Sequence, residues 1–307
     1  MNETMVLCRR YCLVILGVLA ATASCGAGAT HRSAGSGADS SALTAIQTVT
    51  FNVAAGGEAF KCQDFSNPFG QDVAVVETES TMTPGSHHMF VFSDSSIPSR
   101  DTNAVTDCSG IEFHDFIHLT QTAAASFTYP AGVGKEVKAA NGIRILAHYL
   151  NAGSQALNGH VSVNMHWVQP SQIQYLAVGM FLNNLLVFVP PGMSTQSQTF
   201  RVPADANVLL AASHMHARGI GFSATTNAGD VIYRGTQWSD PVPQTFAPPL
   251  VIKAGASIKW SCTYNNTTGM TLTFGESAAK NEMCILAGIV YPVQAGAQLG
   301  TSFQTVF

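Results

Sequence analysis

Charged side chains are scarce in this chain. Only 10% of the 307 residues are Asp, Glu, Lys or Arg, and the formal net charge at pH 7 is −4. Proteins that bind nucleic acids or anionic membranes gather Lys and Arg on one face. No such basic stripe occurs along the sequence. We therefore expect no nucleic-acid partner and no electrostatic attachment to a membrane.

The most apolar run of the N-terminal region is too short to span a membrane. It extends from Tyr11 to Ala20, follows Arg9-Arg10 and precedes small residues. This order is typical of a secretory signal peptide, which we place at residues 1–24. Residues 25–41 are rich in Gly, Ala and Ser and read as a flexible linker. Folded structure should therefore begin near Ala42.

Two cleavage positions are compatible with this signal, after Ala23 or directly before Cys25. The second would leave Cys25 as a lipid-bearing N-terminus, although Thr22 stands where a bacterial lipobox usually has an aliphatic residue. Both alternatives place the protein outside the cytoplasm: in the periplasm, in the cell envelope with or without a lipid anchor at Cys25, or outside the cell.

Cysteines are few once this export region is removed. Three of the seven precede residue 26, which leaves Cys62, Cys108, Cys262 and Cys284. Four cysteines in an exported protein allow three disulfide pairings. Pairing within each half of the chain, Cys62 with Cys108 and Cys262 with Cys284, gives each half one covalent cross-link.

A long helical pattern is absent after Ala42, and alternation with a period of two recurs instead. In residues 161–167 the apolar positions lie on one face of a strand and the polar ones on the other. We predict an all-β protein. About 265 residues suffice for two domains, which we place at 42–169 and 170–307 and call the first and second halves. We also predict a hairpin in which Asn183-Asn184 joins strands 175–182 and 185–189.

The sequence has neither the GxSxG elbow of a hydrolase nor a GxGxxG turn that opens a helix. It does have histidines in short groups. In the first half, His87 and His88 precede an apolar strand and His148 lies within another. Adjacent histidines diverge on a regular strand, so both can bind one metal only at a strand start or a bulge, which Pro84-Gly85 permits. Three imidazoles suit copper and zinc about equally.

In the second half, a strand over residues 207–217 would place Val208, Leu210, Ala212, His214 and His216 on one face, with both imidazoles directed alike. A strand over 282–291 would turn Met283 away from its neighbour Cys284. A methionine is ordinarily core filler. A thioether beside two imidazoles nevertheless favours a copper that is reduced for part of its cycle, and zinc would rarely choose it.

The other histidines of the folded part are isolated in sequence, and we assign them surface or hydrogen-bonded roles. They are His114, His118, His160 and His166.

The ordered series HHM at 87–89, HY at 148–149, HMH at 214–216 and EMC at 282–284 resembles the copper type II, ascorbate-dependent monooxygenases, the family of dopamine beta-monooxygenase and peptidylglycine alpha-hydroxylating monooxygenase, here as a bacterial member. The resemblance implies two jelly-roll-like β-sandwich domains, each with one copper, that face each other across a solvent-filled cleft. His87, His88 and His148 would hold the electron-storing copper. His214, His216 and Met283 would hold the catalytic copper that binds oxygen.

The resemblance implies hydroxylation of a C–H bond in a small organic substrate, with dioxygen and a reductant such as ascorbate. Peptide-amidating relatives bind a substrate carboxylate through an arginine and a tyrosine at positions where this chain has Ala212 and Ala287, so a glycine-extended peptide is not expected as substrate. Two alternatives stay open: a non-catalytic copper-binding or copper-delivery protein of the cell envelope, and a structural sandwich with adventitious histidines.

Overall fold

Folded structure begins where the sequence predicts, because the first strand starts at Ala42. The computed structural model describes residues 41–110, 112, 114–300 and 303–306. The predicted signal peptide 1–24, Cys25 and nearly all of the linker lie outside the described residues.

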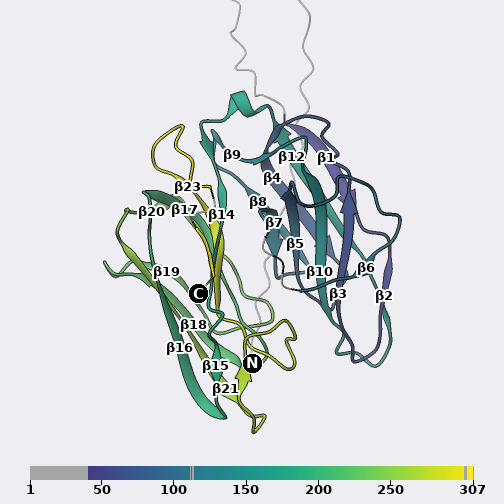
Figure 1. The fold of residues 1–307 in the computed structure, drawn as a ribbon, viewed down its shortest axis with the longest axis vertical. Helices are drawn as coiled ribbons and strands as arrows, with labels where there is room; N and C mark the ends of the chain where they lie inside the picture. The colour runs from purple at the N-terminus through teal and green to yellow at the C-terminus, as the bar shows by residue number, and fades with distance from the viewer. Residues whose placement is uncertain (1–40, 111, 113, 301–302, 307) are drawn as a thin grey trace, which may run out of the picture. The chain divides into compact units, whose positions relative to one another are not determined.

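The first half contributes two large sheets and a small one. The first sheet has the order β1 (Ala42–Gln47), β12 (Val161–Val168), β4 (Val73–Met82), β9 (Val133–Val137) and β13 (Tyr175–Leu176), with β8 (Ala124–Thr128) also paired to β4. The second sheet has the order β6 (Thr106–Asp107), β3 (Glu58–Phe65), β10 (Gly142–Leu150), β5 (Ser86–Asp94) and β7 (Phe116–Thr120). The small sheet pairs β2 (Phe51–Val53) with β11 (Leu157–Gly159). Strands β3, β10 and β5 lie side by side in Figure 1.

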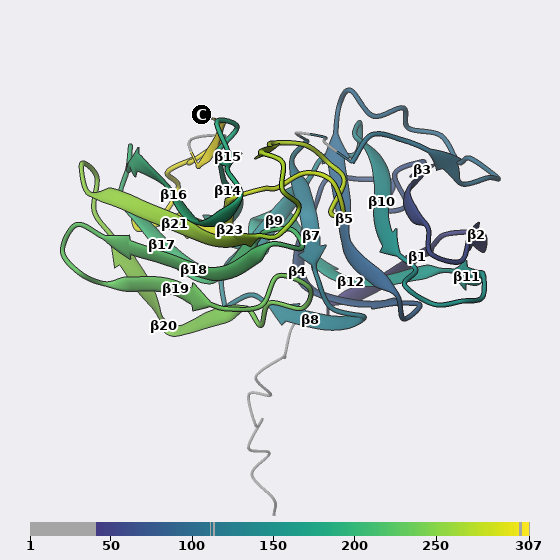
Figure 2. The ribbon, with the colours of Figure 1, turned by 90° about the horizontal axis from the view of Figure 1, so that it is seen from below.

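The second half repeats this division. One sheet has the order β20 (Gln244–Ile252), β17 (Ala206–His214), β23 (Ile285–Pro292), β14 (Val178–Asn183) and β24 (Gln304–Val306). The other has the order β16 (Gly192–Arg201), β21 (Ser257–Asn266), β18 (Gly219–Thr226) and β19 (Val231–Gly235), seen as neighbouring ribbons in Figure 2. A short pair joins β15 (Phe188–Val189) to β22 (Leu272–Thr273).

The prediction of an all-β protein is confirmed. Within the described residues there is no α-helix, and the single helical element is the 3-10 turn η1 (Pro170–Gln172). No helix in this part of the chain is long and apolar enough to cross a membrane.

Each half has its own apolar core, drawn from both of its large sheets. In the first half, Val163 of β12 and Val75 of β4 share a cluster with Ile145 of β10. In the second half, Leu286 of β23 packs in a cluster with Trp260 of β21. Alternation explains this pattern, since every second side chain of a strand points to the same face. Burial of each such aliphatic side chain contributes about 1.5–3 kcal/mol.

The two halves also contact each other. Strand β13 lies beyond the predicted boundary at residue 169 and pairs in parallel with β9 of the first half. A small cluster joins Tyr129 and Val133 to Ala177 and Leu209. Residues 40–307 form one compact unit, and the division at 169/170 stays a prediction.

Both predicted disulfides are present, Cys62–Cys108 and Cys262–Cys284. Such bonds persist in oxidising compartments. The two disulfides are therefore consistent with the predicted export from the cytoplasm.

The predicted hairpin at Asn183-Asn184 is wrong. Strand β14 pairs with β23 and β24, and β15 pairs with β22 instead. The Asn184 backbone N–H donates to Cys284 O, and the Asn184 side chain accepts from the Leu186 N–H. Both asparagines are buried. The pair therefore turns the chain away from the sheet instead of folding it back.

Candidate metal centre

The first-half imidazoles, His87, His88 and His148, lie on two paired strands. His148 of β10 is directly opposite His88 of β5, and the register then shifts so that Tyr149 faces Ser86. His87 is the extra residue of this bulge. The bulge follows Gly85, whose φ is +101°. The sequence predicted this irregularity, and it brings the rings of His87 and His88 to a centroid distance of 5.1 Å.

The second-half ligands, His214, His216 and Met283, lie at strand ends. The predicted strand over 207–217 is interrupted by a bulge between Val208 and Leu210. The expectation that Val208 shares a face with the histidines is therefore wrong, and Val208 lies in the core instead. His214 ends β17, and His216 lies in the turn before β18. Their ring centroids are still only 5.2 Å apart.

Met283 precedes β23 instead of lying within it, so the predicted strand 282–291 begins three residues too early. The expected divergence from its neighbour nevertheless holds. Cys284 belongs to the apolar core, whereas Met283 lines a cavity together with His88, His214 and His216. The Tyr264 hydroxyl donates to Met283 O at 2.8 Å and fixes the backbone there.

The imidazoles of the two halves meet in one cluster. The ring centroid of His214 lies 5.3 Å from that of His87 and 4.9 Å from that of His88. The rings of His87 and His216 are 6.0 Å apart, and those of His88 and His148 are 4.9 Å apart. One ring nitrogen from each of His87, His88 and His214 lies within 4.8 Å of the others. We call the five residues of this paragraph the histidine cluster: His87, His88, His148, His214 and His216.

Hydrogen bonds determine which ring nitrogen of His148, His214 and His216 is protonated. The Glu58 carboxylate accepts from His148 Nε2 at 2.9 Å, so Nδ1 is the free nitrogen there. Asn281 O accepts from His216 Nδ1 at 3.2 Å, which leaves Nε2 free. Metal-binding histidines usually have their second nitrogen held in this way.

Gln121 performs the same task for His214 from the opposite half. Its Nε2 donates to Ser213 O at 2.6 Å, so its Oε1 is the atom that accepts from His214 Nδ1 at 2.7 Å. The Nε2 of His214 is consequently left for a ligand.

Four nitrogens of the cluster are buried without a hydrogen-bond partner in the described part of the chain: His87 Nε2, His88 Nδ1, His148 Nδ1 and His216 Nε2. Buried polar atoms are normally paired, since an unpaired one costs about 1–3 kcal/mol. A metal ion would satisfy such nitrogens.

The imidazoles are held in their neutral, metal-binding form. Burial lowers the pKa of His87, His88 and His214 well below the usual value, and positively charged neighbours would lower it further. Burial also lowers the pKa of His216 to about 4. Burial lowers the pKa of His148, opposed by the Glu58 carboxylate. At neutral pH these rings therefore offer lone pairs and no repelling charge.

The cavity beside the cluster is lined mainly by aromatic and aliphatic side chains. Its aromatic members are Phe60, Phe90, Phe92, Phe181 and Phe274. Among the described residues, no lysine or arginine lines it, and its acidic members are Glu112 and Glu276. About 40 Å³ of it is open to the centres of water molecules, which is room for a few waters and not for an organic molecule.

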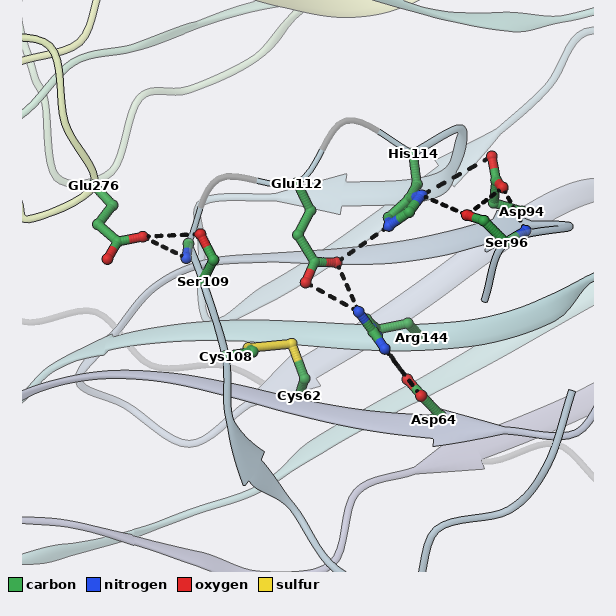
Figure 3. A network of polar contacts seen from close by, with 11 residues as sticks. Cys62, Asp64, Asp94, Ser96, Cys108, Ser109, Glu112, His114, Arg144 and Glu276 are labelled. Carbon is green, nitrogen blue, oxygen red and sulfur yellow. Dashed lines mark hydrogen bonds and ion pairs between the residues drawn. A yellow bond between two sulfur atoms is a disulfide. The ribbon is translucent and has the colours of Figure 1, made fainter. Parts of the chain in front are cut away.

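Glu112 is held at the cavity by a polar network shown in Figure 3. Arg144 Nη1 donates to Glu112 at 3.0 Å, and Arg144 Nε donates to Asp64 at 2.6 Å. His114 lies 3.5 Å from the same glutamate. Because Arg144 and His114 already contact Glu112, this carboxylate has a structural role beside the Cys62–Cys108 disulfide.

The isolated histidines have the hydrogen-bonded or surface roles that the sequence suggested. Thr78 Oγ1 and Ser80 Oγ contact the two nitrogens of buried His118 at 2.8 and 2.9 Å. His114 belongs to the network of Figure 3. His160 and His166 are only partly buried.

Sequence reasoning missed the residues that orient the ligands, namely Glu58, Gln121, Asn281 and Glu282. Glu282 accepts from the backbone N–H groups of His216 and Arg218 and so fixes the turn that carries His216. Its place beside Met283 offered a signal for this role. Glu58 and Gln121 offered none, because each acts on a histidine about 90 residues away.

No protein-family model and no curated protein matches this chain. Among solved structures it is similar to the major capsid protein P2 of bacteriophage PM2, with a TM-score of 0.36, 9% identity and coverage of 84% of this chain and 100% of that one. It is also similar to N-glycanase F (PNGase F), with a TM-score of 0.37, 9% identity and coverage of 86% and 97%. Likeness at this level says nothing about function.

Proposed function

We propose that this protein is an exported copper-dependent monooxygenase of the copper type II, ascorbate-dependent kind, built from two jelly-roll-like sandwich domains. It binds two copper ions per chain through the first-half imidazoles and the second-half ligands. It hydroxylates a C–H bond of a small organic substrate with dioxygen and a reductant such as ascorbate. The observation that carries the proposal is the buried histidine cluster, with four ring nitrogens that lack partners and a methionine on the same cavity.

The donor set suits copper better than other biological metals. Neutral imidazole binds both oxidation states of copper, and a thioether favours the reduced one. Zinc sites more often include a thiolate or carboxylate. The cysteines of each half are joined in disulfides, and the Glu58 carboxylate accepts from Nε2 of His148, the nitrogen opposite the one left free for a metal.

Bound copper would supply one-electron chemistry and reaction with dioxygen. The remaining work falls to the chain. Glu58, Gln121 and Asn281 hold three rings with the correct nitrogen free. The phenylalanines give the cavity an apolar lining, against which an apolar substrate would pack only when the cavity is wider than the few waters it now admits.

The substrate end of the site differs from that of the peptide-amidating relatives. Ala212 and Ala287 face each other across β17 and β23, both buried. None of the described side chains that line the cavity is a lysine or an arginine. A substrate carboxylate would therefore find no partner there, and we propose a substrate without one.

A copper-delivery protein with the same ligands would bind copper without turnover. The aromatic lining next to Met283 favours the enzyme, because copper delivery requires no apolar surface beside the ligands.

Turnover separates these functions. The copper-loaded mature chain is reduced with ascorbate without oxygen, then mixed with 18O-labelled dioxygen and a panel of small amines, phenols and peptides. We expect one labelled oxygen atom in a product and oxygen uptake coupled to it. Copper binding without any labelled product would support delivery instead, and a chain nearly free of copper after dialysis would contradict both functions.

A further inference from the structure

Two glutamates connect the halves in opposite directions beside the histidine cluster. Glu58 of the first half accepts from Ser277 Oγ and from the Ala278 N–H of the second half. Glu276 of the second half accepts from Ser109 Oγ of the first half, as Figure 3 shows. It also accepts from the Gly110 N–H. We call this arrangement the glutamate clasp.

The clasp is linked directly to a ligand. The Glu58 carboxylate that holds Ser277 and Ala278 also accepts from His148. Glu58 therefore orients a first-half ligand while it binds the second-half segment that leads to Met283.

The ligand nitrogens that lie closest together come from both halves of the chain. The three histidines whose nitrogens lie within 4.8 Å of one another are His87, His88 and His214. The first two come from β5 and the third from β17, and all are buried, with exposed fractions of 2%, 5% and 8%. His87 also packs against Trp238 of the second half at a ring distance of 5.5 Å.

We propose that the first metal ion to bind is held jointly by His87, His88 and His214, so that the two halves share one ion, and that the glutamate clasp keeps the halves in this position. The inference rests on the proposed function only for the identity of the metal as copper. It differs from a structure in which each half holds its own ion independently.

Such a shared site limits access. The cavity has room for a few waters while the clasp is formed. An organic substrate has to enter when the second half moves away from the first, and this movement would separate His214 from His87 and His88.

The test is a titration of the metal-free mature chain with up to one equivalent of Cu(II), followed by competition with a chelator and by EPR. His87→Ala and His214→Ala should each lower the affinity for the first ion by about tenfold or more, and each should change its EPR spectrum. His166→Ala, a histidine of β12 away from the cluster, is the matched control and should change neither.

Independent sites give a different result. Removal of a ligand from one half would then leave the site of the other half intact, so at least one of the two variants would bind its first ion with the affinity and spectrum of the unaltered chain. That result would overturn the shared site and leave the proposed monooxygenase function standing. Copper bound by the shared site but without labelled product would overturn the proposed monooxygenase function and leave the shared site standing.

Two further measurements test the shared site if an alanine variant does not fold. In the unaltered chain at two equivalents, a shared cluster should couple the Cu(II) spins, so that the integrated EPR signal falls below two spins per chain; two full spins would contradict the inference. Glu276→Gln touches no ligand. It should lower the affinity for the first ion by less than the ligand variants do. An unchanged affinity would show that the glutamate clasp does not hold the halves in position for the shared ion.

Discussion

The two halves of the metal centre are held in place by different means. The first-half imidazoles lie within β5 and β10, where backbone pairing sets their positions. The second-half ligands lie at the end of β17 and in the irregular segments that follow β17 and precede β23. There, side chains hold the backbone: Glu282 binds the turn of His216, and Tyr264 binds Met283 O.

This difference predicts different sensitivities. A ligand set fixed by strand register should tolerate the loss of a nearby side chain and suffer from backbone changes. A set fixed by side chains should respond in the opposite way. The four predictions below challenge or refine this contrast.

The largest effect is expected for Met283→Ala. The cavity would lose its thioether, so hydroxylation should be abolished while the first-half imidazoles still bind copper, and loss of this buried side chain should lower the free energy of unfolding by about 2–5 kcal/mol. Assays of product formation and copper content measure the effects on hydroxylation and copper binding. Met270→Ala, at an exposed position, should behave like the unaltered chain. An active Met283→Ala variant would show that Met283 fills the core and is not a copper ligand.

The disulfides come next. Their partners are 46 and 22 residues apart, so replacement of either pair by serine should lower the free energy of unfolding by roughly 3–4 kcal/mol in the chain-entropy model. The Cys262/Cys284 variant should also lose product formation, because Cys284 adjoins Met283. Denaturant titration and activity assays compare the two variants, and equal residual activity in both would weaken the contrast between the halves.

Glu282→Ala removes a buried acceptor from two backbone N–H groups. We expect a loss of about 1–3 kcal/mol in the free energy of unfolding, with weaker copper binding by the second-half ligands. Glu79→Ala, at an exposed position of β4, is the control and should change stability by less than about 0.5 kcal/mol. Thermal melts with and without copper measure both effects.

The smallest effect on copper binding is expected for Gly85→Ala. Its φ of +101° is unfavourable for alanine, and the new Cβ would lie 2.8 Å from Leu157 Cδ2. A cost of about 1–3 kcal/mol follows from the backbone strain, with weaker copper binding by the first-half imidazoles. In the control Gly221→Ala, the Cβ meets Thr263 Cβ at an ordinary 3.6 Å. Equal copper binding by the two variants would show that the bulge at His87 does not depend on Gly85.

Local patterns in the sequence predicted much of this structure. Alternation of apolar residues identified β12, and the loss of pattern before Ala42 located the start of the fold. Pro84-Gly85 indicated the bulge at His87, since a turn residue with positive φ precedes it. The disulfides followed from the division of four cysteines between two halves.

Other features depend on contacts distant in sequence and could not be predicted. The bulge after Val208 has no glycine or proline to mark it. Asn183-Asn184 resembles a hairpin turn, but the backbone of Cys284 captures Asn184 instead. The contact between His87 and His214 depends on how the two halves pack, and strand periodicity in the sequence carries no information about that packing.

X-ray absorption at the copper edge of the ascorbate-reduced, copper-loaded mature chain tests the central claim most directly. We expect imidazole nitrogen scatterers together with one sulfur scatterer at copper, and loss of the sulfur in Met283→Ala. A spectrum with no sulfur, or one that is identical in the unaltered chain and the variant, would contradict it.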